Sequence, residues 1–300
     1  MNVVRTKAEL REALAPLRRD ASAIGLVPTM GALHHGHLAL LRAARDRCGL
    51  VVMSLFVNPT QFAAGEDAET YPRDEDRDLE LARGAGVDLV FAPDAEEIYP
   101  TGFATSVEIA GGLTDVLCGD PARRGPDHFH GVATVVAKLF NLVQPDVAFF
   151  GRKDAQQALV VRRMARDLDF PVEIATVDTV READGLAISS RNAYLSAEER
   201  GRAPALSRAL RAAQTAIACE GASVATALFR ARQDLEAAGI DPEYLEARDA
   251  ETLTPAVSLN GRPVLLAVAA RLGRARLIDS VIIEPDSGPT SPRGEGKPGA

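Results

Sequence analysis

The sequence of 300 residues is poor in aromatic and sulfur-containing side chains. It has no tryptophan, and aromatic residues make up only 5% of it. Its three cysteines, Cys48, Cys118 and Cys219, are an odd number at wide spacing, which is untypical of a disulfide-bonded secreted scaffold. Neither a cysteine pair nor a His-Glu-x-x-His pattern offers a zinc site. We therefore expect reduced and mostly structural thiols.

The sequence also lacks long hydrophobic runs and an excess of positive charge. No run of about eighteen apolar residues occurs, so no transmembrane helix is predicted. The first residues lack the order of charged, apolar and small residues that is typical of a signal peptide, and we expect a cytoplasmic protein. The formal net charge of -8 and the pI near 5.3 argue against a protein that coats nucleic acid or a membrane surface. An anionic substrate would need basic residues gathered locally.

The periodicity of apolar residues predicts an α/β fold. Apolar runs predict strands at residues 24–27, 50–57, 89–92, 106–110, 147–150 and 172–177. Helical spacing and capping residues predict helices at residues 7–17, 74–84, 131–143 and 155–168. The run at 50–57, LVVMSLFV, is typical of a central parallel strand that is covered on both faces. Strands alternating with helices predict a Rossmann-like, doubly wound parallel sheet in residues 1–179.

The sequence pattern changes after Val180. Alanine-rich segments predict helices at residues 197–219 and 222–238, and strands are predicted at 244–248, 264–270 and 277–283. This order predicts a smaller α+β C-terminal domain at residues 180–285, which we expect to act as a lid. Residues 286–300 are rich in Gly, Pro and Ser and are predicted to be disordered.

The most informative stretch is IGLVPTMGALHHGHLALLRAARDRC, at residues 24–48. It predicts a strand, a tight loop and a helix, with Gly31, His34, Gly36 and His37 at the helix N-terminus. Such a terminus presents unpaired backbone N–H groups and the positive end of the helix dipole, and it therefore binds anions such as phosphate. A His-x-Gly-His at this place is a mark of nucleotidyl transfer in one large superfamily. The plainer interpretation is a polar turn with surface histidines.

Four further polar clusters follow predicted strands or precede predicted helices. Ligands of open α/β sheets bind beyond the carboxyl ends of the strands, so these clusters are candidates for the same site. Gly151-Arg152-Lys153-Asp154 repeats the order of strand, glycine, polar turn and helix start, and Lys153 can neutralise phosphate. The four clusters lie at residues 58–61, 128–131, 151–157 and 189–192.

Five stretches together resemble the pantoate–β-alanine ligase family, within the superfamily of class I aminoacyl-tRNA synthetases and nucleotidylyltransferases. They are VPTMGALHHGH, SLFVNPTQF, YPR, HFHGVATVVAKLFNLVQPDVAFFGRKDAQQ and DGLAISSRNAYL, and they cover most of residues 24–195 in order. The resemblance implies condensation of pantoate with β-alanine through a pantoyl adenylate, with release of AMP and pyrophosphate. It also implies Mg²⁺ accompanying ATP, and a homodimer. The last hundred or so residues resemble the family more weakly.

The resemblance also implies roles for individual residues. Catalytic roles fall to His34, His37, Lys153 and Arg191. Pantoate or β-alanine would contact Gln61, Gln157, Asn58 and His128. ATP would contact the catalytic four and a further set: Met30, Gly31, Gly151, Asp154, Val180, Ile188, Ser189 and Ser190. Asp78 is the candidate if magnesium takes a protein ligand, but no metal ligand is assigned.

Three departures from the family pattern affect details. Arg152 stands where relatives usually have an acidic residue, and we expect its side chain to point to solvent. The loop arginine is shifted by one position, so either Arg123 or Arg124 could reach the substrate. Cys118 replaces a glutamate of the family.

Two alternatives stay open at the level of the sequence. The His-x-Gly-His signal alone also permits a nucleotidylyltransferase that leaves AMP on its product. A catalytically silent nucleotide-binding regulator is the alternative outside the enzymes.

Overall fold

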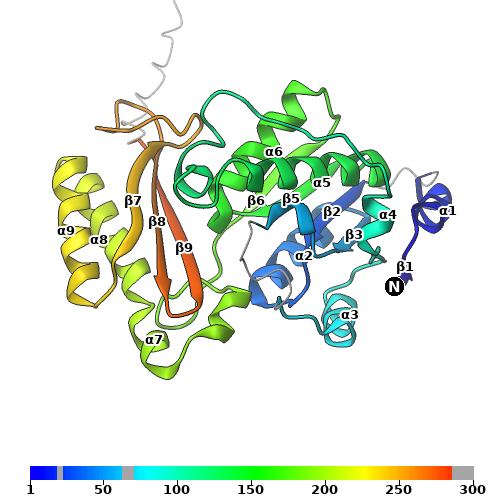
Figure 1. Cartoon of the computed structure of the whole chain (residues 1–300), viewed down its shortest axis with the longest axis horizontal. Coiled ribbons are helices and arrows are strands. Elements are labelled where there is room, and N and C mark those ends of the chain that lie inside the picture. Colours follow the sequence, from blue (N-terminus) through cyan, green and yellow to red (C-terminus); the bar gives the residue numbers. More distant parts are fainter. Residues whose placement is uncertain (19–22, 63–70, 286–300) are drawn as a thin grey trace, which may run out of the picture.

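The structure is a computed structural model of the chain, and it describes residues 1–18, 23–62 and 71–285. These residues form a six-stranded sheet and a three-stranded sheet, each covered by helices (Figure 1). The first sheet consists of β1 (Asn2–Val4), β2 (Ile24–Thr29), β3 (Leu50–Leu55), β4 (Leu89–Phe91), β5 (Val147–Gly151) and β6 (Glu173–Val177). The second consists of β7 (Pro242–Asp249), β8 (Val264–Leu272) and β9 (Ala275–Ile283).

The helices follow the predicted alternation. Those of the first part are α1 (Lys7–Leu17), α2 (His35–Arg47), α3 (Glu75–Gly84), α4 (Ala95–Ile98), α5 (Asp127–Val143) and α6 (Ala155–Asp167). Those of the second part are α7 (Ala197–Arg202), α8 (Ala205–Ala218) and α9 (Val224–Ala237). None of the helices in the described ranges is both long and apolar enough to cross a bilayer.

All pairings in the first sheet are parallel, and the strand order is β1-β4-β3-β2-β5-β6. Strands β3 and β4 follow β2 on one side of it, and β5 then pairs with the other side of β2. Ligands of open α/β sheets bind at such a switch in strand order. The carboxyl ends of β2 and β5 therefore mark the expected site, as the sequence predicted.

Two apolar layers cover the faces of this sheet. Alternate residues of β3 enter different clusters: Val52 packs with buried residues of α1, α5 and α6, whereas Val51 and Met53 pack with α2 and α3. Burial on both faces explains the continuous apolar run of this strand. The doubly wound Rossmann-like sheet is thereby confirmed.

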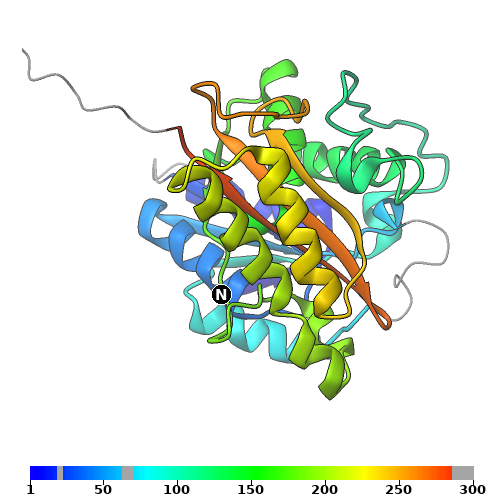
Figure 2. The same ribbon diagram turned by 90° about the vertical axis from the view of Figure 1, so that its left-hand side faces the viewer.

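The second sheet is antiparallel, in the order β7-β8-β9. Helices α8 and α9 pack together over one face of it (Figure 2) and share a buried cluster with all three strands. Its other face joins the first core, because Tyr244, Leu265, Ala267 and Ala269 belong to the cluster that contains α5 and α6. The smaller α+β part is thus packed directly against the parallel sheet.

The structure corrects three expectations about elements and adds one strand that the sequence pattern did not predict. Residues 106–110 alternate in burial but pair with no strand in the described chain. The predicted helix at 197–219 is instead two helices, α7 and α8, which are separated by Ala203 and Pro204. Helix α5 begins at Asp127 rather than at 131, and β1 was not predicted. The predicted disorder of 286–300 lies outside the described residues, and a domain boundary at 179 stays a prediction.

Candidate active site

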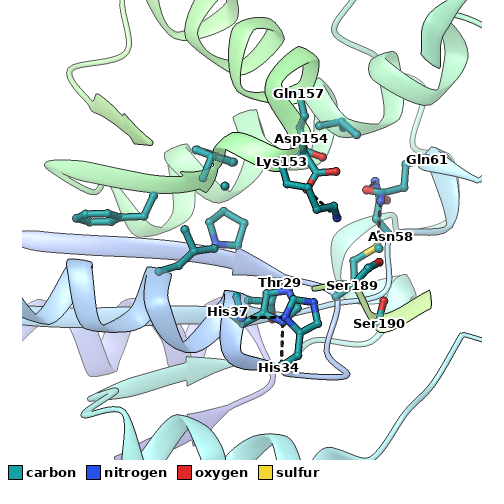
Figure 3. Close-up of a pocket in the computed structure, with 18 of the residues that line it drawn as sticks. Thr29, His34, His37, Asn58, Gln61, Lys153, Asp154, Gln157, Ser189 and Ser190 are labelled. Atoms are coloured by element: carbon teal, nitrogen blue, oxygen red, sulfur yellow. Dashed lines mark hydrogen bonds and ion pairs between the residues drawn. The ribbon is translucent and has the colours of Figure 1, made fainter. Parts of the chain in front are cut away.

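One pocket lies at the carboxyl ends of β2, β3, β5 and β6. Every predicted site residue lines it except Gly31, which lines the neighbouring hollow with Asp78. Figure 3 shows Lys153 pointing into the space between the histidines on one side and Gln61 with Asn58 on the other. Further lining residues that the sequence did not single out include Thr29, Ser54, Tyr71, Val132 and Phe150.

His34 and His37 form the start of α2. His34 is the N-cap residue, and its Nδ1 accepts a hydrogen bond from the Gly36 backbone N–H at 3.2 Å. The Nδ1 of His37 accepts the His34 backbone N–H at 3.3 Å. Since both Nδ1 atoms accept, the neutral rings carry their hydrogens on Nε2. The rings stack with centroids 4.0 Å apart.

Burial keeps these imidazoles uncharged. It lowers the pKa of His34 to about 4, with a further contribution from the Lys153 ammonium. The pKa of His37 lies well below its ordinary value because of burial first, then the His34 ring and Lys153. Neutral imidazoles with Nε2–H groups can donate to phosphate oxygens without protonation at neutral pH. The pair therefore supplies donors and leaves the positive charge to other residues.

Asp78 of α3 holds the loop between β2 and α2 by hydrogen bonds to its backbone. This carboxylate is 1% exposed, and its oxygens accept the backbone N–H groups of Ala32 at 2.8 Å and Leu33 at 2.7 Å. Burial raises the pKa of Asp78, and these two hydrogen bonds oppose the shift. Gly31 adopts φ +87, and a Cβ there would meet Asp78 Oδ2 at 2.9 Å. Asp78 therefore shapes the loop from outside the main pocket.

Asn58 lines the pocket, but its amide group is hydrogen-bonded to other residues of the protein. It is 1% exposed, and its Nδ2 donates to Gln61 Oε1 and to the Gly131 carbonyl, both at 3.1 Å. Its Oδ1 accepts from the Tyr99 hydroxyl at 2.8 Å and the Thr60 hydroxyl at 3.0 Å. These contacts employ both amide hydrogens and the oxygen. Asn58 is thus placed to position η2 (Pro59–Gln61) rather than to bind a substrate directly.

Gln61 is held at both ends of its amide. Its Oε1 accepts from Asn58, and its Nε2 donates to Met30 Sδ at 2.9 Å. One Nε2 hydrogen and one Oε1 lone pair stay available to a polar ligand. Gln61 therefore presents a fixed donor and acceptor to the pocket.

Lys153 and Asp154 follow β5 in η4 (Arg152–Asp154). The Lys153 Nζ lies 3.4 Å from Asp154 Oδ2, and the lysine side chain is mostly buried. Gln157, in the first turn of α6 (Ala155–Asp167), lines the same pocket. Arg152 is half-exposed, pairs with Asp178 at 2.7 Å and does not line the pocket, so its side chain lies outside the site as expected.

The third wall comes from the segment after residue 180. Val180 and Ile188 line the pocket together with the first two residues of η5 (Ser190–Tyr194) and its N-cap Ser189. The Oγ of Ser189 accepts the Arg191 backbone N–H at 3.3 Å. The hydroxyl of Ser190 lies 3.2 Å from that of Tyr71. Tyr71 lies in the YPR stretch, so its motif was visible in the sequence, but no role was assigned to it.

The structure distinguishes the two loop arginines. Arg124 lines the pocket, and its Nη1 donates to His128 Nε2 at 3.1 Å. The Nδ1 of His128 then donates to the Gln61 carbonyl at 2.6 Å, because a guanidinium can only donate and a carbonyl can only accept. Arg123 instead donates to the Leu117 carbonyl and Glu246 and lies over the Tyr244 ring. Arg124 is therefore the arginine that reaches the site.

Cys118 lies behind the site in the contact between the two parts of the molecule. Its buried thiol is 3.3 Å from the Tyr244 hydroxyl and accepts from Arg276 Nη1 at 3.3 Å. Its backbone N–H donates to Gln156 at 3.0 Å. Cys118 thus makes a packing contact and does not line the main pocket.

Comparison with known proteins agrees with this geometry. The family described as pantoate-beta-alanine ligase matches residues 2–282. Proteins named pantothenate synthetase from Moorella thermoacetica and pantothenate synthetase 1 from Bradyrhizobium diazoefficiens are each 54% identical to this chain. The alignments cover 95% and 94% of this chain, and 99% and 98% of the two relatives.

Solved structures share the whole fold. A crystal structure of pantothenate synthetase from Thermus thermophilus has a TM-score of 0.88 at 53% identity, covering 95% of this chain and 100% of that chain. The pantoate-beta-alanine ligase from Francisella tularensis, complexed with beta-gamma ATP and beta-alanine, has a TM-score of 0.79 at 29% identity. It covers 94% of this chain, which in turn covers 97% of it. The chain therefore belongs to the pantoate–β-alanine ligase family.

Proposed function

We propose that this chain condenses pantoate with β-alanine at the expense of ATP, through a pantoyl adenylate, and releases AMP and pyrophosphate. The observation that supports this most directly is that one pocket contains both the donors suited to phosphate, from His34, His37 and Lys153, and the fixed amide of Gln61. Membership of the ligase family, and the ligands of the Francisella relative, support the same reaction.

In the first step a carboxylate oxygen of pantoate attacks the α-phosphorus of ATP, and the bond to the pyrophosphate oxygen breaks. Negative charge accumulates on the phosphate oxygens. The Nε2–H groups of His34 and His37 donate to these oxygens, while Lys153 and Arg191 neutralise the departing pyrophosphate. The donors are already oriented by the helix start, so little reorganisation accompanies the reaction.

In the second step the amine of β-alanine attacks the carbonyl carbon of the mixed anhydride. The carbon–oxygen bond to AMP breaks, and the nitrogen loses a proton as the amide forms. Gln61 and Gln157 orient the pantoyl group, and Arg124 binds the carboxylate of a substrate with its guanidinium. Exclusion of water by residues 180–285 protects the anhydride from hydrolysis.

Magnesium fits this scheme as a companion of ATP. Within the described residues, no group of three or more His, Cys, Asp or Glu side chains lies together in a way that would hold a metal. The carboxylate of Asp154 pairs with Lys153. We therefore propose that Mg²⁺ is carried by phosphate oxygens and water, as is usual for nucleotide-bound magnesium. When bound, it would neutralise phosphate charge.

We also infer a cytoplasmic homodimer. Residues 104–110 are mostly exposed, and the backbone N–H groups of Ser106, Glu108 and Ala110 make no hydrogen bond to the described chain. An exposed segment with such free backbone groups can pair with a second copy about a two-fold axis. Light scattering coupled to gel filtration would report twice the mass of 31.8 kDa; a monomer at micromolar concentration would contradict the dimer. The three cysteines, which form no disulfide, support the location.

An assay that omits each substrate in turn tests the reaction. We expect AMP release only when ATP, pantoate and β-alanine are all present, and exchange of pyrophosphate into ATP with pantoate alone. A nucleotidylyltransferase would instead accumulate an adenylated product without free AMP. A silent nucleotide-binding regulator would show neither activity. Either of those results would overturn the proposal.

A further inference from the structure

We propose that two neighbouring residues of β9, Asp279 and Ser280, set the spacing between the two loops that face the ATP phosphates. One loop carries Lys153 and the other carries Ser189 to Arg191. Neither β9 residue lines the main pocket, so both are positioning residues. The inference rests on the proposed function, since it assigns both loops to the adenylation step.

Asp279 anchors the hairpin that leads into the second loop. Its carboxylate accepts a bidentate pair of hydrogen bonds from Arg181, Nη1 to Oδ2 at 2.6 Å and Nη2 to Oδ1 at 3.0 Å. Both side chains are buried, with 13% of Arg181 and 2% of Asp279 exposed. Arg181 also donates to the Gly185 carbonyl and the Ser207 hydroxyl. A bidentate pair fixes orientation as well as distance.

The hairpin transmits this position to the pocket. Arg181 and Ala187 form an antiparallel bridge, and the Ile188 N–H donates to the Val180 carbonyl at 3.0 Å. Val180 and Ile188 both line the pocket, and Ser189 follows directly. The place of the Ser189 loop therefore depends on where Arg181 is held.

Ser280 anchors the other loop. It is 8% exposed, and its Oγ donates to the Arg152 carbonyl at 3.1 Å. That carbonyl belongs to the peptide bond between Arg152 and Lys153, so the hydroxyl holds the backbone from which the lysine side chain extends. Ser280 reaches this peptide from the second sheet, whose strand β9 lies next to the parallel sheet (Figure 1).

Adjacent residues on a strand point to opposite faces. Asp279 and Ser280 can therefore hold two different loops from one short piece of backbone. Because β9 is paired with β8 along its length, its two residues cannot shift independently. The second sheet thereby fixes the distance between Lys153 and the Ser189 loop, although none of its strands β7, β8 and β9 contributes a side chain to the main pocket.

The variant that tests this is Ser280→Ala, which removes one buried hydroxyl and little volume. We expect pyrophosphate exchange with pantoate to slow about tenfold, on the scale of small misplacements of a reacting group. The reaction of chemically prepared pantoyl adenylate with β-alanine should stay within about twofold of wild type, because it needs no pyrophosphate contacts. Ser280→Thr keeps the hydroxyl and should recover most of the exchange rate.

A matched control contacts the same strand from a helix. Gln214 of α8 donates to the Ile282 carbonyl at 2.8 Å, away from both loops, and Gln214→Ala should leave both steps unchanged. Asp279→Asn should slow exchange more than Ser280→Ala, because Arg181 loses its buried counter-charge. Wild-type exchange in a folded Ser280→Ala protein, or an equal loss in both steps, would overturn the proposal. Failure of the proposed function differs, since the wild-type chain would then show no exchange.

Discussion

The amide of Asn58 donates to Gln61 Oε1 and to the Gly131 carbonyl, each at 3.1 Å. One side chain thus joins η2 to α5 and orients the residue that we assign to pantoate. Asn58→Ala leaves Gln61 without this donor and removes a buried side chain that bonds to three further groups, Gly131, Tyr99 and Thr60, at a cost of about 1–3 kcal/mol. We expect KM for pantoate to rise about tenfold or more, measured by steady-state kinetics with saturating ATP.

Tyr99→Phe is the milder companion of that change. It removes only the hydroxyl that donates to Asn58 Oδ1, so KM for pantoate should rise by no more than about fivefold, on the scale of one neutral hydrogen bond. An Asn58→Ala protein with normal KM for pantoate would show that Asn58 does not act through Gln61.

Gly131 permits α5 to pack against η2 at backbone distance. A Cβ at this position would lie 2.3 Å from the Thr60 carbonyl oxygen and 2.8 Å from the Gln61 nitrogen. Gly131→Ala must therefore move η2, and we expect a loss of activity above tenfold together with lower stability, about 1–3 kcal/mol. Gly84→Ala is the matched control, since it also lies in a helix but has open space. Thermal unfolding and turnover measured on both variants would separate the close contact from helix propensity.

The half-buried histidines predict a pH dependence of stability. The pKa of His34 is about 4 in the folded chain, below its ordinary value of 6.5. The unfolded chain therefore binds the proton first as pH falls, and His34 contributes stability that is complete above pH 6.5 and is lost between pH 6.5 and about 4. Urea titrations at pH 7 and pH 5 should show a smaller fall in unfolding free energy for His34→Asn than for wild type. Identical falls would contradict the burial of a neutral ring.

The neighbouring arginines provide a matched pair. Arg124→Ala should raise KM for a carboxylate substrate about tenfold, the scale of one charged hydrogen-bonding partner, with little effect on unfolding. Arg123→Ala should leave KM unchanged but lower the unfolding free energy by about 1–2 kcal/mol, because Arg123 pairs with Glu246 and covers the Tyr244 ring. Kinetics and denaturant titration of both variants decide the assignment. The opposite pattern would place Arg123 in the site.

Loss of a phosphate-directed donor is expected to affect adenylation most strongly. His37→Ala and Lys153→Ala should each slow formation of the adenylate about a hundredfold or more, the scale of one preorganised donor. Rapid-quench measurement of a single turnover reports this step directly. A near-normal burst of adenylate in either variant would remove that residue from the proposed role.

Much of the fold was accessible from the sequence because local pattern and tertiary burial agree. The run at 50–57 is apolar because β3 is covered on both faces, and Thr6 caps α1 as its position before a helical pattern suggests. The predicted end of the first of the central strands, at residue 27, is wrong by two residues. Strand β2 continues through Thr29, because β3 pairs with it as far as that residue. A proline is tolerated at position 28 because β5 pairs with β2 only at Gly25 and Leu26, so β2 has a single neighbour there.

Other features depend on contacts that no local pattern reveals. The alternation at residues 106–110 is that of a strand, but a strand also needs a neighbour, and the described chain provides none. The choice between Arg123 and Arg124 follows from where Glu246 and His128 lie in space. Asn58 was assigned to substrate from its motif, whereas its partners Tyr99 and Gly131 come from distant parts of the sequence.

The capping arrangement of α2 has an evolutionary consequence. In most helices the N-cap residue can be exchanged for Ser, Asp or Asn to gain stability without affecting anything else. Here the same imidazoles end the helix and face the pocket. An acidic cap at His34 would complete the helix well but would repel the phosphates of the nucleotide. Selection for a sturdier protein and selection for a faster enzyme therefore oppose each other at this one turn.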